Sequence, residues 1–311
     1  MSLLSLIAAF LLEQFHPLAT RKYLFIWMNS YADFFQLHFN AGEHKHGKIA
    51  WIAAMSLPLL SVSWVYWLLM GMHPVFAWIG CVLVLYLTMG FRHFSHYFTD
   101  IQKALRKRDL DGARALLSKW TGKSCHELSA EEVARVTIEQ ALLASHRNVF
   151  GVVIWFVIFM LFGLGPVGAI LYRLALFLNA RWATRGSEDL GDFGKFAHLA
   201  CRVIEWLPLR LTAITFAIVG DFEDTVYCWR TQAQSWPDPE AGIVLASGAG
   251  ALGVRLGMTV VLDASPVFRP EIGMDEEADV DSMQSAIGLV WRALVFWLVL
   301  LLLLSLASLV G

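Results

Sequence analysis

The feature that most constrains this fold is a long apolar stretch, Val149–Leu178, that is broken in its middle by Gly163-Leu164-Gly165-Pro166. Proline lacks a backbone N–H and glycine is conformationally loose, so the break ends one helix before another begins. Each apolar arm is shorter than the about 20 residues that cross a bilayer easily. The stretch therefore predicts either a helical hairpin that dips into or just crosses a membrane, or an ordinary turn between two helices. Irregular backbone at membrane depth must be covered, which makes this break a first place to look for a site.

Composition places the chain among integral membrane proteins. Apolar residues make up 57% of the 311 residues, and they gather in long runs. A net charge of −2 gives no argument for nucleic-acid binding. The four cysteines lack CxxC spacing, so neither a zinc site nor a disulfide framework is expected.

Other apolar runs predict further spans. Ile49–Met72, Pro74–Gly90 and Ile287–Val310 are predicted to cross the membrane. Ser2–Leu12 is short for a span; it either lies at the interface or, as we favour, completes a crossing with its flanks. Basic residues lie before the first of these spans and after the second, so the positive-inside rule places both flanks in the cytoplasm. The turn at residues 71–73 is then outside.

The expected fold is an all-α, polytopic membrane protein with a cytoplasmic helical region. We predict N-terminal membrane helices over residues 1–90, a cytoplasmic helical region over 91–148, a membrane hairpin over 149–178, an amphipathic and glycine-rich region over 179–286, and a C-terminal membrane helix over 287–311.

Local signals refine the polar parts. Arg92–Arg108 and Asp109–Trp120 have helical patterns. Ser129 followed by Glu132 predicts a capping box that starts a helix running into the hairpin. Asp263–Asp281 is expected to be an acidic loop.

The glycine-rich run Gly242–Gly257 has two interpretations. Small residues let helices approach closely, and they also let backbone approach a phosphate. There is no Walker lysine and no preceding strand, so close helix packing is favoured over a nucleotide loop.

Three segments carry a resemblance to a known family. They are Gly90-Phe91-Arg92 with Arg108–Arg114 and Trp120-Thr121-Gly122-Lys123; Gly165–Arg173 with Trp206–Ala213; and Pro239–Gly257 with Arg269-Pro270-Glu271-Ile272-Gly273. From about Gly90 to Trp291 the chain resembles the CobD/CbiB family of membrane proteins. The resemblance implies synthesis of adenosylcobinamide phosphate from adenosylcobyric acid and an aminopropanol phosphate, in a bacterial inner membrane that the chain crosses several times. The expected partners are the lipid bilayer and a corrinoid or phosphorylated small molecule.

Several acids of the family pattern are replaced. Its Glu-Asn…Asp-Gly stretch is Ala144–Asn148 here, its paired aspartates are Cys201-Arg202, and the asparagine of its Pro-Asn-Ala-Gly is Glu240. Such acids would be natural Mg²⁺ ligands or general bases. We therefore expect this chain not to replace a canonical synthase at normal efficiency. The middle region is also similar to AmpE, which implies a non-catalytic regulatory role in cell-wall or β-lactamase control as the alternative. A transporter is a weaker hypothesis that rests on the broken hairpin alone.

Candidate site residues follow from the acids and cations that remain. Glu139 and Glu205 are the candidate catalytic residues, and Mg²⁺ is a candidate cofactor. The candidate ligand-binding residues are Arg92, His146, Arg147, Tyr172, Arg173, Arg210, Glu240 and Arg255. The cations suit a phosphate or carboxylate, or they fix the topology at the cytoplasmic edge.

Overall fold

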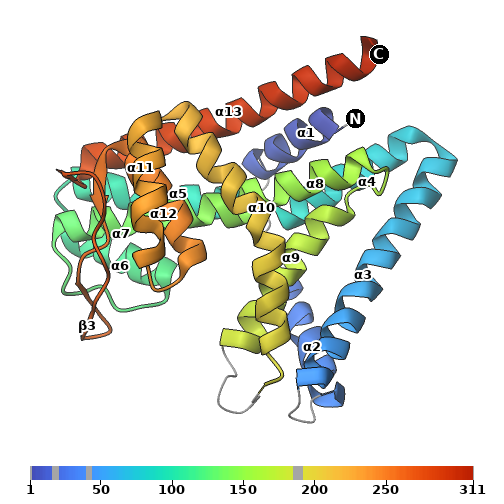
Figure 1. Cartoon of the computed structure of the whole chain (residues 1–311), viewed down its shortest axis with the longest axis horizontal. Coiled ribbons are helices and arrows are strands. Elements are labelled where there is room, and N and C mark those ends of the chain that lie inside the picture. The colour runs from blue at the N-terminus through green and yellow to red at the C-terminus, as the bar shows by residue number, and fades with distance from the viewer. Residues whose placement is uncertain (1, 16–20, 40–43, 185–191, 311) are drawn as a thin grey trace. The chain divides into compact units, whose positions relative to one another are not determined.

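The computed structural model describes residues 2–15, 21–39, 44–184 and 192–310. The chain forms two compact units, which are treated separately below (Figure 1). Unit 1 comprises Met1–Gly90 and Gly151–Pro208, and unit 2 comprises Phe91–Phe150 and Leu209–Gly311. Each unit therefore combines two stretches that are distant in the sequence.

Unit 1 is built from helices alone in its described part. Its elements are α1 (Ser2–Phe15), α2 (Arg21–Phe39), α3 (His44–Met72), α4 (Pro74–Thr88), α8 (Gly151–Leu161), α9 (Val167–Asn179), a π-helical turn η2 (Ala180–Thr184) and the first part of α10 (Lys195–Val219). Helix α3 packs on α2, α4 and α9, and α1 packs on α4. Arg181 of η2 donates to Asp33 of α2 through Nε and Nη2, at 2.9 and 2.6 Å, which ties these elements together.

Helices α8 and α9 lie on either side of the predicted break and pack against each other. The turn between them has Gly163 and Gly165 at positive φ, 71° and 65°, a backbone conformation that suits glycine. The two helices approach closely because Gly168 faces the backbone of Trp155 and Gly151 faces the ring of Tyr172. The turn itself packs on α3, since a Cβ at Gly165 would lie 2.5 Å from the Tyr66 ring.

Two helices of unit 1 contain an internal proline, and aromatic side chains from neighbouring helices compensate for both. Pro58 in α3 cannot donate to the carbonyl of Ala54, and the Tyr31 hydroxyl donates to that oxygen instead, at 2.8 Å. Pro208 in α10 likewise cannot serve Ile204, whose carbonyl accepts from the Trp155 indole at 3.1 Å. These contacts satisfy carbonyls that the prolines leave open within otherwise apolar surroundings.

In unit 2, four helices pack against the largely buried helix α7. Its helices are α5 (Phe91–Arg106), α6 (Leu110–Thr121), α7 (Ala130–Ser145), a π-helical turn η1 (His146–Phe150), the end of α10, α11 (Phe222–Gln232), a 3-10 turn η3 (Ala233–Ser235), α12 (Pro239–Leu252) and α13 (Val280–Val310). The helical pattern predicted for Arg92–Arg108 corresponds to α5, and its regularly spaced apolar residues are buried: Phe94, Phe98, Ile101 and Leu105. The capping box at the start of α7 is confirmed, because Ser129 Oγ accepts from the Glu132 N–H while the Glu132 carboxylate accepts from the Ser129 N–H.

Short strands correct the expectation of an acidic loop after α12. Strands β1 (Val254–Leu256), β4 (Ile272–Gly273) and β5 (Glu276–Glu277) form one sheet in the order β4-β1-β5, with β1 antiparallel to β4 and parallel to β5. Strands β2 (Val260–Leu262) and β3 (Ser265–Val267) form a separate hairpin. Its turn residue Asp263 exchanges two hydrogen bonds with the Ser124 backbone, at 2.7 and 3.1 Å. The segment thus gains its structure from partners that lie far away in the sequence.

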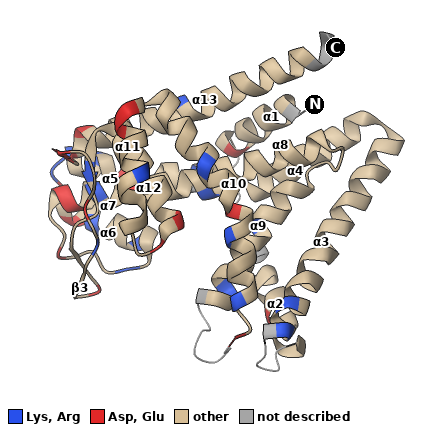
Figure 2. Ribbon diagram, viewed as in Figure 1, with Lys and Arg blue, Asp and Glu red and all other residues tan. Residues whose placement is uncertain are grey.

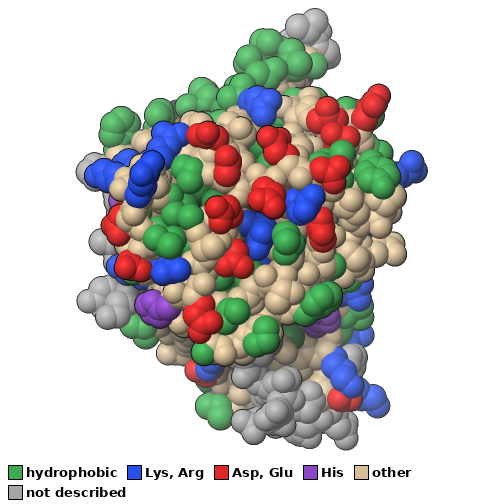
Figure 3. All heavy atoms as spheres, turned by 90° about the vertical axis from the view of Figure 1, so that its left-hand side faces the viewer, with side chains coloured by type: hydrophobic (Ala, Val, Ile, Leu, Met, Phe, Trp, Pro, Cys, Tyr) green, Lys and Arg blue, Asp and Glu red, His purple; other side chains and the backbone are tan. Residues whose placement is uncertain are grey.

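Three helices are long and apolar enough to cross a membrane within the described ranges: Lys45–Met72, Ala130–Leu161 and Val280–Ala307. The second is α7 continuing through η1 into α8, so the first hairpin arm is the end of a 32-residue helix rather than an isolated short one. Helices α1 and α4 are apolar but shorter. Figure 2 shows α4 and α8 without charged residues, whereas a face of unit 2 intersperses acidic and basic side chains (Figure 3).

Candidate functional site at the start of the glycine-rich helix

Glycines in α12 allow unusually close packing in unit 2. A Cβ at Gly242 would lie 2.1 Å from the Ala233 carbonyl oxygen, and one at Gly250 would lie 2.5 Å from that of Asp224 in α11. A Cβ at Gly248 would lie 2.6 Å from Cδ1 of Leu142 in α7. The structure therefore supports the helix-packing interpretation of this run. Close packing fixes where the first turn of α12 lies.

Two carboxylates and an arginine meet at that first turn. Asp238 caps α12, because its Oδ1 accepts from the N–H groups of Glu240 and Ala241 at 3.1 and 3.3 Å, and Pro239 occupies the first helical position. The other oxygen of Asp238 lies 3.9 Å from Nη2 of Arg147. The side chains of Arg147 and Asp238 are about half exposed, at 45% and 52%, so solutes can reach this pair.

The Glu240 carboxyl perturbs the neighbouring Asp238. Burial raises the pKa of Asp238, and the adjoining Glu240 carboxyl raises this pKa further, while Arg147 and the Ala241 N–H oppose the shift. A bound cation would relieve this unfavourable proximity. The corner defined by Asp238, Glu240 and Arg147 is called the α12 corner below.

The π-helical turn η1 positions Arg147 beside the corner. His146 precedes Arg147, is fully buried, and its Nδ1 lies 2.9 Å from Oγ1 of Thr212 in α10. This contact anchors η1 to α10 and leaves Arg147 at the surface. Single π-helical turns within α-helices often accompany functional sites.

Glu139 occupies a different place, buried in unit 2. Its Oε2 forms an ion pair with Nη1 of Arg269, and its Oε1 accepts from the Gly257 N–H at 2.9 Å. Both carboxylate oxygens therefore have partners inside the protein. This contact joins α7 to the chain that follows β1.

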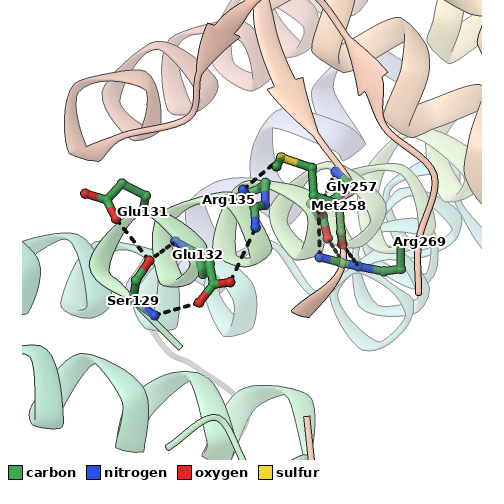
Figure 4. Close-up of polar contacts among 8 residues, drawn as sticks. Ser129, Glu131, Glu132, Arg135, Gly257, Met258 and Arg269 are labelled. Carbon is green, nitrogen blue, oxygen red and sulfur yellow. Dashed lines mark hydrogen bonds and ion pairs between the residues drawn. The ribbon is translucent and has the colours of Figure 1, made fainter. Parts of the chain in front are cut away.

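Arg269 makes several other contacts around the same turn. It donates to the carbonyls of Gly257 and Met258 at 3.2 Å each, and its guanidinium lies 5.8 Å from the ring centroid of Trp236. Both turn residues have positive φ, 83° at Gly257 and 64° at Met258. On the other side of this turn, Arg135 Nη1 lies 3.4 Å from the Met258 sulfur (Figure 4).

A second buried carboxylate lies in unit 1. Glu205 of α10 is 7% exposed, accepts from the Tyr172 hydroxyl at 3.4 Å, and lies 3.8 Å from the Cys201 sulfur. Two predicted site residues, Glu205 and Tyr172, are therefore in contact within unit 1.

The remaining predicted residues are distributed over both units. Arg255 of β1 forms an ion pair with Glu271 at 2.9 Å and donates to the Asp275 carbonyl at 3.1 Å, so it holds the small sheet together. Arg92, Arg173 and Arg210 are half-buried in α5, α9 and α10. Among the residues that the structure describes, no three or more His, Cys, Asp or Glu side chains are placed together so as to hold a metal.

Sequence reasoning missed several residues of these clusters. Asp238 had a readable signal, because Asp-Pro-Glu is a helix-start pattern, with a cap, a proline at the first position and an acid in the first turn. Arg269 belongs to the Arg269–Gly273 segment that resembles the family, but no local pattern predicts its pairing with Glu139, which lies 130 residues away in the sequence. Trp236 and Thr212 likewise become noticeable only through their contacts.

The fold and its clusters define a class: a polytopic, all-α membrane protein with a polar helical unit. Within that class, the chain belongs to the CobD/CbiB family, because the family model described as CobD/Cbib protein matches residues 6–290. This match extends further toward the N-terminus than the resemblance seen in the motifs. No solved structure matches the chain.

Curated relatives cover nearly the same length. "Cobalamin biosynthesis protein CobD" of Stutzerimonas stutzeri is 33% identical over 306 residues, which is 96% of each chain. The protein of that name from Chromobacterium violaceum is 36% identical over 245 residues, covering 79% of this chain and 76% of its own. "Cobalamin biosynthesis protein CbiB" of Salmonella typhimurium is 26% identical over 263 residues, covering 82% and 80%.

Proposed function

We propose that this protein acts in cobalamin biosynthesis, from a bacterial inner membrane, by condensing a corrin carboxylate with an aminopropanol phosphate. The observation that supports this most is the α12 corner. Its Glu240 lies in the Pro239–Gly257 stretch that resembles the family, and Asp238 directly precedes that stretch. The corner combines two carboxylates with a cation at a surface that solutes can reach.

The three side chains of the corner suit a phosphorylated substrate. Arg147 supplies a guanidinium for phosphate or carboxylate oxygens. Asp238 and Glu240 fit a Mg²⁺ ion, because Mg²⁺ is commonly held by one or two carboxylates together with substrate phosphates. Burial raises the pKa of Asp238 and the adjoining Glu240 carboxyl raises it further, and a bound cation would stabilise both carboxylates in their charged form. When bound, the ion supplies positive charge toward the phosphate oxygens.

Within this proposal Glu139 and Glu205 have other roles than metal binding. Glu139 is already engaged by Arg269 and Gly257. Glu205 interacts with Tyr172, and we retain it as a candidate acid within the hairpin unit. We propose that the α12 corner stabilises the negative charge that develops in the reaction, because hydrogen-bond donors and cations must be positioned in advance where that charge forms.

The second candidate is an AmpE-like regulatory protein without catalytic activity. Its specific support is the replacement of the family acids by Ala144–Asn148 and Cys201-Arg202. A protein of this kind would keep the fold but would not form the amide.

Complementation of a strain that lacks the canonical synthase distinguishes the two candidates. We expect rescue of corrinoid-dependent growth that is slower than with the canonical synthase. Asp238→Asn, Glu240→Gln and Glu205→Gln should abolish this rescue, whereas Glu127→Gln, an exposed acid after α6, should retain it. Absence of rescue by the wild-type chain, with its presence in the membrane verified by immunoblot, would favour the regulatory protein. Loss of rescue in Glu205→Gln alone would instead place the catalytic site in unit 1, around Glu205.

A further inference from the structure

The buried Glu139–Arg269 pair is connected to the α12 corner through one aromatic side chain. Trp236 precedes Asp238 by two residues, and its ring centroid lies 5.8 Å from the Arg269 guanidinium. Its ring also lies against Gly257, where a Cβ would meet the ring at 3.1 Å. Trp236 is therefore held against the same turn that Glu139 and Arg269 fix.

The other side of Trp236 contacts α12 itself. A Cβ at Gly242 would lie 2.9 Å from the Trp236 Cβ, so the first turn of α12 rests directly on this residue. A continuous set of contacts thus runs from α7 through Arg269 and Trp236 to the capped start of α12. Rigid packing of this kind is how a protein holds ligand groups in a productive geometry.

We propose that Glu139, Arg269 and Trp236 are positioning residues that hold the Asp238–Glu240 carboxylate pair in place. This inference rests on the proposed function for its importance to activity, but the positioning itself concerns only the structure. Glu139 orients Arg269, the Arg269 guanidinium lies over the Trp236 ring, and Trp236 fixes the loop that enters α12. The site requires this support because Asp238 and Arg147 are half exposed and receive little packing of their own.

Hydrogen exchange measures this positioning without reference to catalysis. The readout is the exchange rate of a peptide spanning residues 236–245, which contains the two N–H groups that Asp238 caps. In Arg269→Gln and Glu139→Gln we expect exchange in this peptide to quicken by at least about tenfold, because the cap opens locally. A peptide from α5 should keep its wild-type exchange rate.

Substitutions at Trp236 provide a matched pair that avoids disturbing the buried charges. Trp236→Phe keeps an aromatic face under the guanidinium and should retain protection, whereas Trp236→Leu keeps apolar bulk without that face and should lose it. Equal exchange in Trp236→Leu and wild type would overturn the inference. So would equal acceleration of the 236–245 and α5 peptides in every variant, because that result indicates general destabilisation.

The activity arm separates this inference from the proposed function. If the wild type complements, Arg269→Gln should lower rescue and Trp236→Phe should preserve it. If the wild type does not complement while the exchange results hold, the positioning stands and the proposed reaction fails.

Discussion

Two aromatic residues of unit 1 stabilise the fold through hydrogen bonds to single backbone carbonyls as well as through their apolar packing. Trp155 and Tyr31 each donate to a carbonyl that a proline four residues downstream has left without its helical donor. An unsatisfied carbonyl in apolar surroundings costs more than an average hydrogen bond contributes. Each proline and its distant aromatic partner therefore act as a pair.

This pairing predicts a compensation between two substitutions. Trp155→Phe should lower the free energy of unfolding by about 1–3 kcal/mol, because the Ile204 carbonyl loses its donor. In the double variant Trp155→Phe with Pro208→Ala, residue 208 again has an N–H, and most of that loss should be recovered. Denaturant unfolding in detergent micelles measures both. Equal losses in the single and double variants would contradict the pairing.

At the scale of an element, α12 depends on glycines whose neighbours are backbone atoms. Gly250 is one such case, because its neighbour is the Asp224 carbonyl, which cannot rotate away as a side chain can. Gly288 in α13 has no atom within 4 Å of an added Cβ. The two positions therefore differ in packing although both are helical.

Alanine at these two positions should have opposite effects. Gly250→Ala should destabilise unit 2 by about 1–3 kcal/mol through overpacking. Gly288→Ala should be neutral or stabilising by up to about 1 kcal/mol, because alanine is the better helix former. Thermal unfolding of the two variants provides the comparison, and similar melting shifts in the same direction would disprove it.

The start of α13 provides a prediction with a defined pH dependence. Asp279 Oδ1 accepts from the N–H groups of Asp281 and Ser282 and from the Ser282 hydroxyl, and the hydroxyl contributes most to lowering the pKa of Asp279 below 3.8. Because the folded-state pKa is lowered, the stabilisation is fully present above pH 3.8 and is lost as the pH falls through the folded-state value.

Replacing this cap tests the sign. Asp279→Ala should cost about 0.5–2 kcal/mol at neutral pH. Asp279→Asn keeps a capping oxygen without a titrating group, so its stability relative to wild type should improve as the pH falls below 3.8. Unfolding free energies measured between pH 3 and 7 give this difference. A difference that does not vary with pH would show that the carboxylate charge contributes nothing.

For the whole molecule, the topology remains a prediction from charge. Basic residues flank the hairpin, so reporter fusions after Asn148 and after Arg185 should both report cytoplasm, and a fusion within residues 71–73 should report the outside. Arg185 itself lies outside the described residues. Paired cytoplasmic and periplasmic reporters at each point supply the measurement. Opposite locations for Asn148 and Arg185 would rule out a hairpin that returns to its side of origin.

Local patterns account for much of the helical fold and for little of the site. The apolar face of α5, the capping box at Ser129 and the break at Gly163–Pro166 are all visible in short windows, and the structure contains each of them. Arg147 and Glu240 were recognisable as candidates, and Asp238 was recognisable as a helix cap. Their meeting in one corner was not, because it depends on how η1 and α12 pack.

The sequence by itself determined which segments are helical, which are apolar enough for a membrane, and which family the motifs resemble. These properties follow from periodicity, capping and composition, which act over one or a few turns. Only the tertiary structure decided the partners of the buried charges and the existence of the small strands. Glu139 meets Arg269, and β1 meets β4 and β5, through contacts between distant segments. Such pairings depend on the simultaneous packing of several elements, and no single stretch of sequence specifies them.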